Sequence, residues 1–97
     1  MKFDKSKWNE QQDPLFPSSY RPEMFKDLTT NNKLVGMNYN QLIAKLGTPD
    51  NKGGGLISYK IMVEYGGGID PVYTKELRFA VSKDSLISSY KVVEWRK

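Results

Sequence analysis

The sequence predicts an α+β domain in which two short N-terminal helices pack on one face of a three-stranded antiparallel meander, in the order ααβββ. Two observations lead to this class. Apolar residues recur with the helical period as far as Leu46, and from Ile57 onward they alternate with polar residues, as in a half-buried strand. The connections between the strands are short, which favours antiparallel neighbours. A chain of 97 residues with 38% apolar residues has room for one core.

Residues 1–19 are predicted to form an extended arm or tether, and residues 20–97 a single domain. The arm is polar, contains two prolines and shows no hydrophobic period. Isolated apolar side chains in such a segment either dock on their own domain or recruit a partner, and both alternatives stay open here. The candidate anchors are Phe3, Trp8, Leu15 and Phe16.

The first helix is predicted from Arg21 to Asn31. Pro22 is tolerated only in the first turn of a helix, so the helix begins near Ser19 or Tyr20. Three apolar side chains with helical spacing share one face and are expected in the core: Met24, Phe25 and Leu28.

The second helix lies within the stretch from Leu34 to Asp50 and carries signals for both of its ends. Asn38 is the predicted N-cap, and Gln41 three residues later completes a capping box. Gly47 is expected in a left-handed conformation just beyond the last turn, and Pro49 prevents continuation. The apolar stripe of this helix consists of Tyr39, Leu42, Ile43 and Leu46.

Three strands are predicted, at 57–65, 73–82 and 86–95. The first alternates cleanly, and glycine runs at 53–55 and 66–68 bound it. The third is ambiguous, because its apolar residues fall on both faces. Either a β-bulge near Ser88-Ser89 brings them to one face, or both faces are partly covered.

Composition excludes several classes of function. The chain has 15 Lys+Arg and 11 Asp+Glu, spread over both halves, whereas nucleic-acid binders concentrate basic charge on one face. It has no cysteine and no histidine, which removes thiol nucleophiles, Ser-His pairs and nearly every structural zinc site. No apolar run is long enough to span a membrane, and the first nine residues are too polar for a signal peptide.

The remaining candidates for chemistry are glycine runs and carboxylates. Neither glycine run lies between a strand and a helix, as phosphate loops do. Glu64 and Glu76 lie on neighbouring predicted strands, where they can face one another, but outward positions among basic residues favour cross-strand ion pairs. We therefore predict no catalytic residue, no cofactor-binding residue and no metal ligand. The carboxylates considered were Glu64, Asp70, Glu76, Asp84 and Glu94.

The aromatic residues of the strands suggest a protein-binding surface. Tyr and Trp are enriched at protein interfaces, and the last strand carries apolar groups on both faces and is a candidate sheet edge. The predicted contact surface is the open face of the sheet together with the loop from Gly66 to Tyr73. The residues predicted to bind a partner are Tyr73, Tyr90 and Trp95.

From Arg21 to Trp95 the chain resembles a small module of bacterial envelope proteins. The resemblance is carried by LVGMNYNQLIAKLGTPD from Leu34 to Asp50, by LRF in the second strand and by the final VVEW. The module occurs in the SmpA/OmlA (BamE-like) lipoproteins and in the repeats of β-lactamase inhibitor proteins. The chain departs from the lipoproteins in having no cysteine for a lipid anchor.

The resemblance implies a non-enzymatic binding or assembly module of the cell envelope, corresponding to the soluble part of a lipoprotein. It also implies a protein partner, no cofactor, no nucleic acid, and membrane contact only through a lipid anchor absent from this chain. The implied location is the periplasm or the outer membrane, and the alternative is a cytoplasmic relative. Two other functions stay open: a domain that senses a ligand or peptide between helices and sheet, and an inhibitor-type protein-binding module.

Overall fold

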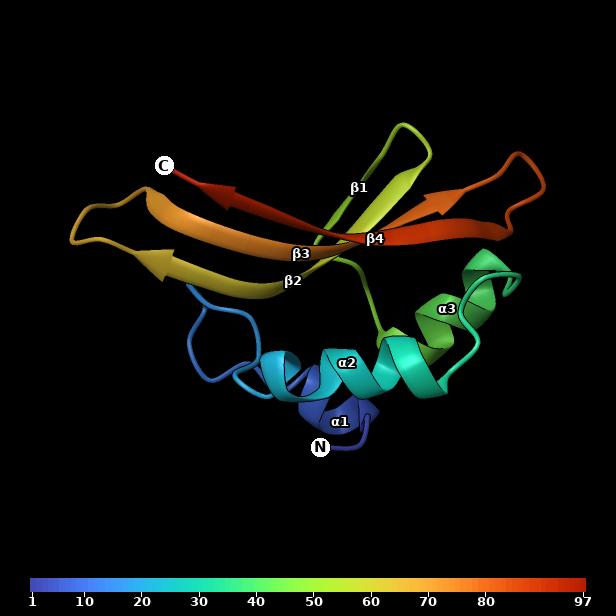
Figure 1. Cartoon of the computed structure of the whole chain (residues 1–97), viewed down its shortest axis with the longest axis horizontal. Coiled ribbons are helices and arrows are strands. Elements are labelled where there is room, and N and C mark those ends of the chain that lie inside the picture. Colours follow the sequence, from blue (N-terminus) through green and yellow to red (C-terminus); the bar gives the residue numbers. More distant parts are fainter.

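The computed structural model describes all 97 residues, as a four-stranded antiparallel sheet with three helices on one of its faces (Figure 1). The strands follow one another in the sheet in chain order. The elements are α1 (Lys5–Trp8), α2 (Arg21–Asn31), α3 (Tyr39–Leu46), β1 (Asn51–Gly53), β2 (Leu56–Tyr65), β3 (Pro71–Val81) and β4 (Ile87–Arg96).

The prediction of two helices and a three-stranded sheet is wrong, because the sheet has a fourth strand, β1. Gly53 pairs with Leu56 across Gly54 and Gly55, whose φ angles are +59° and +77°. Positive φ at both central residues is what a two-residue type I′ hairpin turn requires. The sequence pattern missed β1 because three residues, one of them glycine, are too few to show alternation.

The third helix, α1, lies inside the segment predicted to be an arm. The Asp4 side chain caps it by accepting hydrogen bonds from the backbone N–H groups of Ser6 and Lys7. Four residues make only about one helical turn, so the apolar positions cannot recur and no period is visible in the sequence. Trp8 at the end of α1 is fully buried, and residues 1–19 therefore contribute to the same core as the rest of the chain.

Hydrogen bonds attach this N-terminal segment to both longer helices. The Phe3 N–H donates to the Asp27 carboxylate of α2 at 2.8 Å, and this bond holds the pKa of Asp27 below its ordinary value. The Asn9 amide donates to the carbonyl of Leu46 at 3.0 Å and so satisfies an orphan carbonyl at the end of α3.

The core lies between the helices and the sheet. The Tyr59 ring is fully buried, and its hydroxyl donates to the Gly47 carbonyl at 2.6 Å. Burial raises the pKa of Tyr59, so the phenol stays neutral and remains a donor. The core cluster comprises Trp8, Met24, Leu28, Leu34, Leu42, Leu46, Ile57, Tyr59, Ile61, Leu77, Phe79 and Ile87.

The capping box predicted for α3 is confirmed. The Asn38 side chain accepts from the Gln41 N–H at 2.8 Å, and the Gln41 side chain accepts from the Asn38 N–H at 3.0 Å. At the other end, Gly47 has the expected positive φ, +89°, but its ψ of −172° lies outside the left-handed helical region. This extended conformation with positive φ is essentially restricted to glycine.

Replacing Gly47 by alanine is expected to destabilise the protein by about 2–3 kcal/mol. Besides the backbone strain, the new Cβ would lie 2.8 Å from the Asn9 side-chain oxygen and displace the amide that caps α3. Gly36→Ala is the matched control, since Gly36 has φ of +96° but open space around its Cβ position. Urea denaturation should show a larger loss for Gly47→Ala, and equal losses would contradict the role of Asn9.

Arg21 is a buried cation that joins three segments of the chain. Its Nε donates to the Trp8 carbonyl at 2.8 Å, and its Nη1 donates to Asp50 Oδ2 and to the Lys60 carbonyl, each at 2.8 Å. Asp50 Oδ2 also accepts from the Lys60 N–H at 2.8 Å. The Arg21–Asp50 pair thus satisfies both backbone groups of Lys60 at the edge of β2, where a neighbouring strand would otherwise bond.

Of the two alternatives for the last strand, the β-bulge is present at Ser88, but it does not bring all the apolar residues to one face, since Val93 and Trp95 remain on the face away from the helices. Ala80 pairs with Ser89 and Val81 pairs with Ile87, which leaves Ser88 without a partner in β3. The bulge brings Ile87 to the helix-covered face together with Tyr90, whose hydroxyl donates to the Thr29 carbonyl of α2.

Candidate functional site

The three residues predicted to bind a partner do not share one surface. Trp95 pairs with Thr74 on the face away from the helices, and its side chain is 48% exposed. Tyr90 pairs with Phe79, a core residue, and therefore lies on the helix-covered face at the sheet margin. The structure brings neither of them together with Tyr73.

Tyr73 is largely buried, with 7% of its surface exposed. Burial raises its pKa, as does the nearby Glu94 carboxylate, while the Arg96 guanidinium that stacks over its ring at 4.4 Å acts in the opposite direction. The Tyr73 ring is therefore not freely accessible to a protein partner. The neighbouring loop does expose Ile69, which is 94% accessible at the tip of the β2–β3 hairpin.

The surface that the helices leave uncovered is the opposite face of the sheet, here called the open face. Its members alternate along each strand with core residues such as Ile57, Leu77 and Phe79, and they are paired across the strands. The open face comprises Leu56, Ser58, Lys60, Thr74, Glu76, Arg78, Ala80, Ser89, Lys91, Val93 and Trp95.

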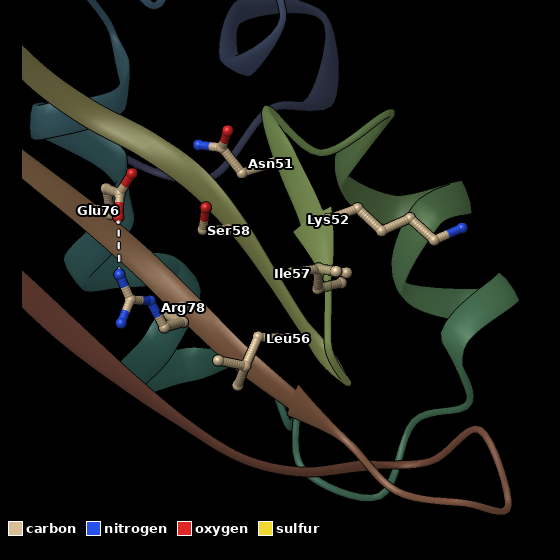
Figure 2. A pocket seen from close by; sticks show the side chains of 8 residues that line it. Asn51, Lys52, Leu56, Ile57, Ser58, Glu76 and Arg78 are labelled. Carbon is tan, nitrogen blue, oxygen red and sulfur yellow. Dashed lines mark hydrogen bonds and ion pairs between the residues drawn. The ribbon is translucent and has the colours of Figure 1, made fainter.

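A shallow hollow of about 440 Å³ occupies the part of the open face nearest to β1. Figure 2 shows Ser58 between Asn51 on one side and the Glu76–Arg78 pair on the other, with Leu56 at the margin. Arg78 Nη2 and Glu76 Oε2 lie 3.2 Å apart. The Lys52 side chain points away from this group, and its Nζ lies 4.9 Å from the centre of the Tyr39 ring.

The charge of the open face is predominantly basic. Lys60, Arg78 and Lys91 face outward with a single carboxylate, Glu76. Glu76 already pairs with Arg78, and its side chain is 19% exposed against 33% for Arg78. The arrangement offers two unpaired ammonium groups and an exposed indole, a combination that suits an acidic surface with an apolar spot.

The carboxylates considered as acid–base candidates are separated. Glu76 lies opposite Lys60 in the sheet, whereas Glu64 lies opposite Tyr73, so the possibility that the two glutamates face one another is wrong. Glu94 lies 3.8 Å from the Lys75 ammonium on the neighbouring strand. No group of three or more metal-ligating side chains occurs in the structure.

A second hollow, of about 320 Å³, lies between α3 and the β1–β2 hairpin. Tyr39 borders it on the helix side. The rest of its lining comes from residues 52–57 of the β1–β2 hairpin, from Val81 and from Ser85. This is where a ligand between helices and sheet, the alternative function considered from the sequence, would have room.

Sequence reasoning missed the buried Arg21 and its ion pair with Asp50. The signal was present, since a charged residue directly before Pro22 at a helix start has no obvious local partner. Its partners lie 13, 29 and 39 positions away along the chain, however, and no local pattern reports such contacts.

No helix of the structure is both long enough and apolar enough to cross a membrane. Comparison with protein-family models, curated proteins and solved structures finds no match to this chain.

Proposed function

We propose that the protein is a non-enzymatic binding or assembly module that holds a protein partner on the open face of its sheet. The observation that carries the proposal is that the helices cover one face and leave the other exposed, with Trp95 at 48% and Leu56 at 43% accessibility. Trp and Arg are the residue types most enriched among the side chains that dominate binding at protein interfaces, and the open face carries both, Trp95 near one end and Arg78 in the hollow near β1.

The partner is proposed to present an acidic surface. Lys60 lies opposite Glu76, the single carboxylate of the open face, but Glu76 is already paired with Arg78 at 3.2 Å. Lys91 lies opposite Arg78 and has no carboxylate opposite it. Complementary charge accelerates association and selects among partners, and its effect falls with ionic strength. Binding is therefore expected to weaken as salt is raised.

A cell-envelope location is part of the proposal and is supported by the resemblance of the Gly36–Asp50 element to the BamE-like module. The same resemblance supports a role in assembly rather than in catalysis.

Capture experiments with two matched pairs of variants test the open face. Arg78→Glu reverses a charge on the open face, and Lys26→Glu makes the same change on α2. Trp95→Ser removes an exposed apolar side chain from the open face, and Leu15→Ser does so on the N-terminal segment, where Leu15 is 64% exposed.

We expect Arg78→Glu and Trp95→Ser to reduce capture of a partner from a native envelope extract by about tenfold or more, while both controls retain it. Circular dichroism of each variant checks that the fold persists. Undiminished capture by the two open-face variants would show that the partner binds elsewhere.

A further inference from the structure

β4 is an edge strand, and the direction of its backbone groups follows from one hydrogen bond. The Lys97 N–H donates to the Val72 carbonyl at 2.9 Å, so Lys97 and every second residue before it, as far back as Ser89 beside the bulge, direct their N–H and C=O groups toward β3. The intervening residues direct theirs away from the sheet. These residues, here called the free edge, are Tyr90, Val92, Glu94 and Arg96.

The other backbone edges of the sheet are partly closed. At the start of β4, the Ile87 N–H donates to the Met37 carbonyl, and the Ile87 carbonyl accepts from the Gly36 N–H, each at 2.8 Å. On β2 the backbone groups of Lys60 are bonded by Asp50 and Arg21. The free edge has no such cover, and Val92 near its centre is 42% exposed.

The side chains of β4 are self-complementary about Val93. If two copies pair antiparallel with a two-fold axis at Val93, Tyr90 of one copy lies opposite Arg96 of the other, and Lys91 lies opposite Trp95. Each exposed aromatic ring of the strand then faces a cation. Val92 lies opposite Glu94, and Val93 lies opposite its own copy.

Neighbouring registers lack this match. An axis at Glu94 places two carboxylates opposite each other, which is destabilising. An axis at Val92 places Lys91 opposite Val93 and Trp95 opposite Ser89, so both cation–aromatic pairs are lost. Registers shifted by a single residue would align the free edge with backbone groups already bonded to β3.

From the free edge and its charge pattern we infer that the occupant of this edge is a second copy of the chain, paired antiparallel through β4 with the axis at Val93. The two sheets then form one eight-stranded sheet with continuous open faces. The contact is a single strand pair, below the ~1,200 Å² of stable interfaces, so association is expected to be weak and to require high protein concentration.

Single-cysteine variants test the register, because the chain has no cysteine of its own. Across an antiparallel pair that is not hydrogen-bonded, Cα atoms lie ~4.5 Å apart, within the ~4.4–6.8 Å span of disulfides. Val93→Cys should therefore cross-link to its copy. The matched control is Lys91→Cys on the same face, whose copy is four residues away along the strand, ~13 Å.

Mild oxidation of each variant at ~0.5 mM protein, followed by a non-reducing gel, should give disulfide-linked dimer at least ~10-fold faster for Val93→Cys than for Lys91→Cys. Equal rates, or a maximum at another β4 position, would overturn the inferred pairing.

A second measurement addresses the free edge itself. Val92→Pro removes an N–H that points away from β3, whereas Val92→Ala keeps it, so both variants retain the β3–β4 ladder. Sedimentation from ~10 µM to ~1 mM should show reversible dimer for the unmodified chain and Val92→Ala and at least ~10-fold weaker association for Val92→Pro.

A chain that stays monomeric throughout that range, or a Val92→Pro variant that associates as well as Val92→Ala, would refute the edge contact. Either result leaves the proposal for the open face unaffected, because capture of a partner by the open face does not require pairing through β4.

Discussion

Replacing Trp8 by alanine is expected to lower the free energy of unfolding by about 4 kcal/mol, the largest effect among the variants considered. Trp8 is fully buried and its ring lies 5.7 Å from that of Phe3 and 6.2 Å from that of Tyr59. The Arg21 guanidinium also stacks on it at 4.8 Å. Truncation would leave a cavity between α1, α2 and β2, in a protein whose total stability is of the order of 5–15 kcal/mol.

The matched control is Trp95→Ala, the same substitution at an exposed position. Because Trp95 is 48% exposed on the open face, its truncation is expected to change stability by less than about 1 kcal/mol. Urea denaturation followed by far-ultraviolet circular dichroism measures both variants without relying on tryptophan fluorescence. Similar losses for the two variants would mean that residues 1–19 do not form part of the core in solution.

Trp8→Phe separates packing from polarity at this position. The indole Nε1 of Trp8 is buried and has no hydrogen-bond partner, and an unpaired buried donor costs about 1–3 kcal/mol. Trp8→Phe gives up some packing but removes the unpaired donor. Its loss of unfolding free energy should therefore be less than half of the loss caused by Trp8→Ala. A loss as large as that of alanine would contradict this account.

Replacing Arg21 by methionine is expected to destabilise the protein by about 3 kcal/mol. The methionine fills much of the same volume but leaves the carbonyls of Trp8 and Lys60 and the Asp50 carboxylate without their shared donor. The effect lies at the low end for a broken buried pair, because the Asp50 side chain is 32% exposed and water can reach it.

Arg78→Met is the matched control for this substitution, since Arg78 is one-third exposed and its single ion pair is with Glu76 at 3.2 Å. We expect a change within about 0.5 kcal/mol there. A double-mutant cycle of Arg21→Met with Asp50→Ala should give a coupling energy of at least about 1 kcal/mol. A coupling energy near zero would show that Arg21 acts through its backbone acceptors alone.

The predictable part of the fold is the part with local signals. The start of α2 followed from Pro22, and the start of α3 followed from the capping box of Asn38 and Gln41. The sequence also indicated the alternation in β2 up to the register shift after Lys60, and it offered the bulge in β4 as one of two alternatives. α1 and β1 were missed because each is too short to repeat a pattern, and both are held by contacts with distant segments.

For the candidate site, the sequence indicated which residue types take part but not which of them share a surface. Aromatic residues in the strands suggested a surface, but the faces on which Tyr90 and Trp95 lie depend on the bulge at Ser88, which shifts the parity of the whole strand. Tyr73 is buried under Arg96, a contact across strands that the sequence does not reveal. Which of these aromatic side chains are exposed therefore follows only from the strand pairing in the folded sheet.

The hydrogen bonds of Arg21 and Asp50 with the Lys60 backbone affect how further strands can add to the sheet. A strand approaching along β2 would meet two side chains where it needs two backbone groups, so the sheet cannot extend continuously past that point. On that side of the sheet the outer strand is β1, whose three residues offer only a short edge, whereas pairing through the free edge of β4 is symmetric and self-terminating. The Arg21–Asp50 pair thus removes one of the places at which a further strand could add to the sheet.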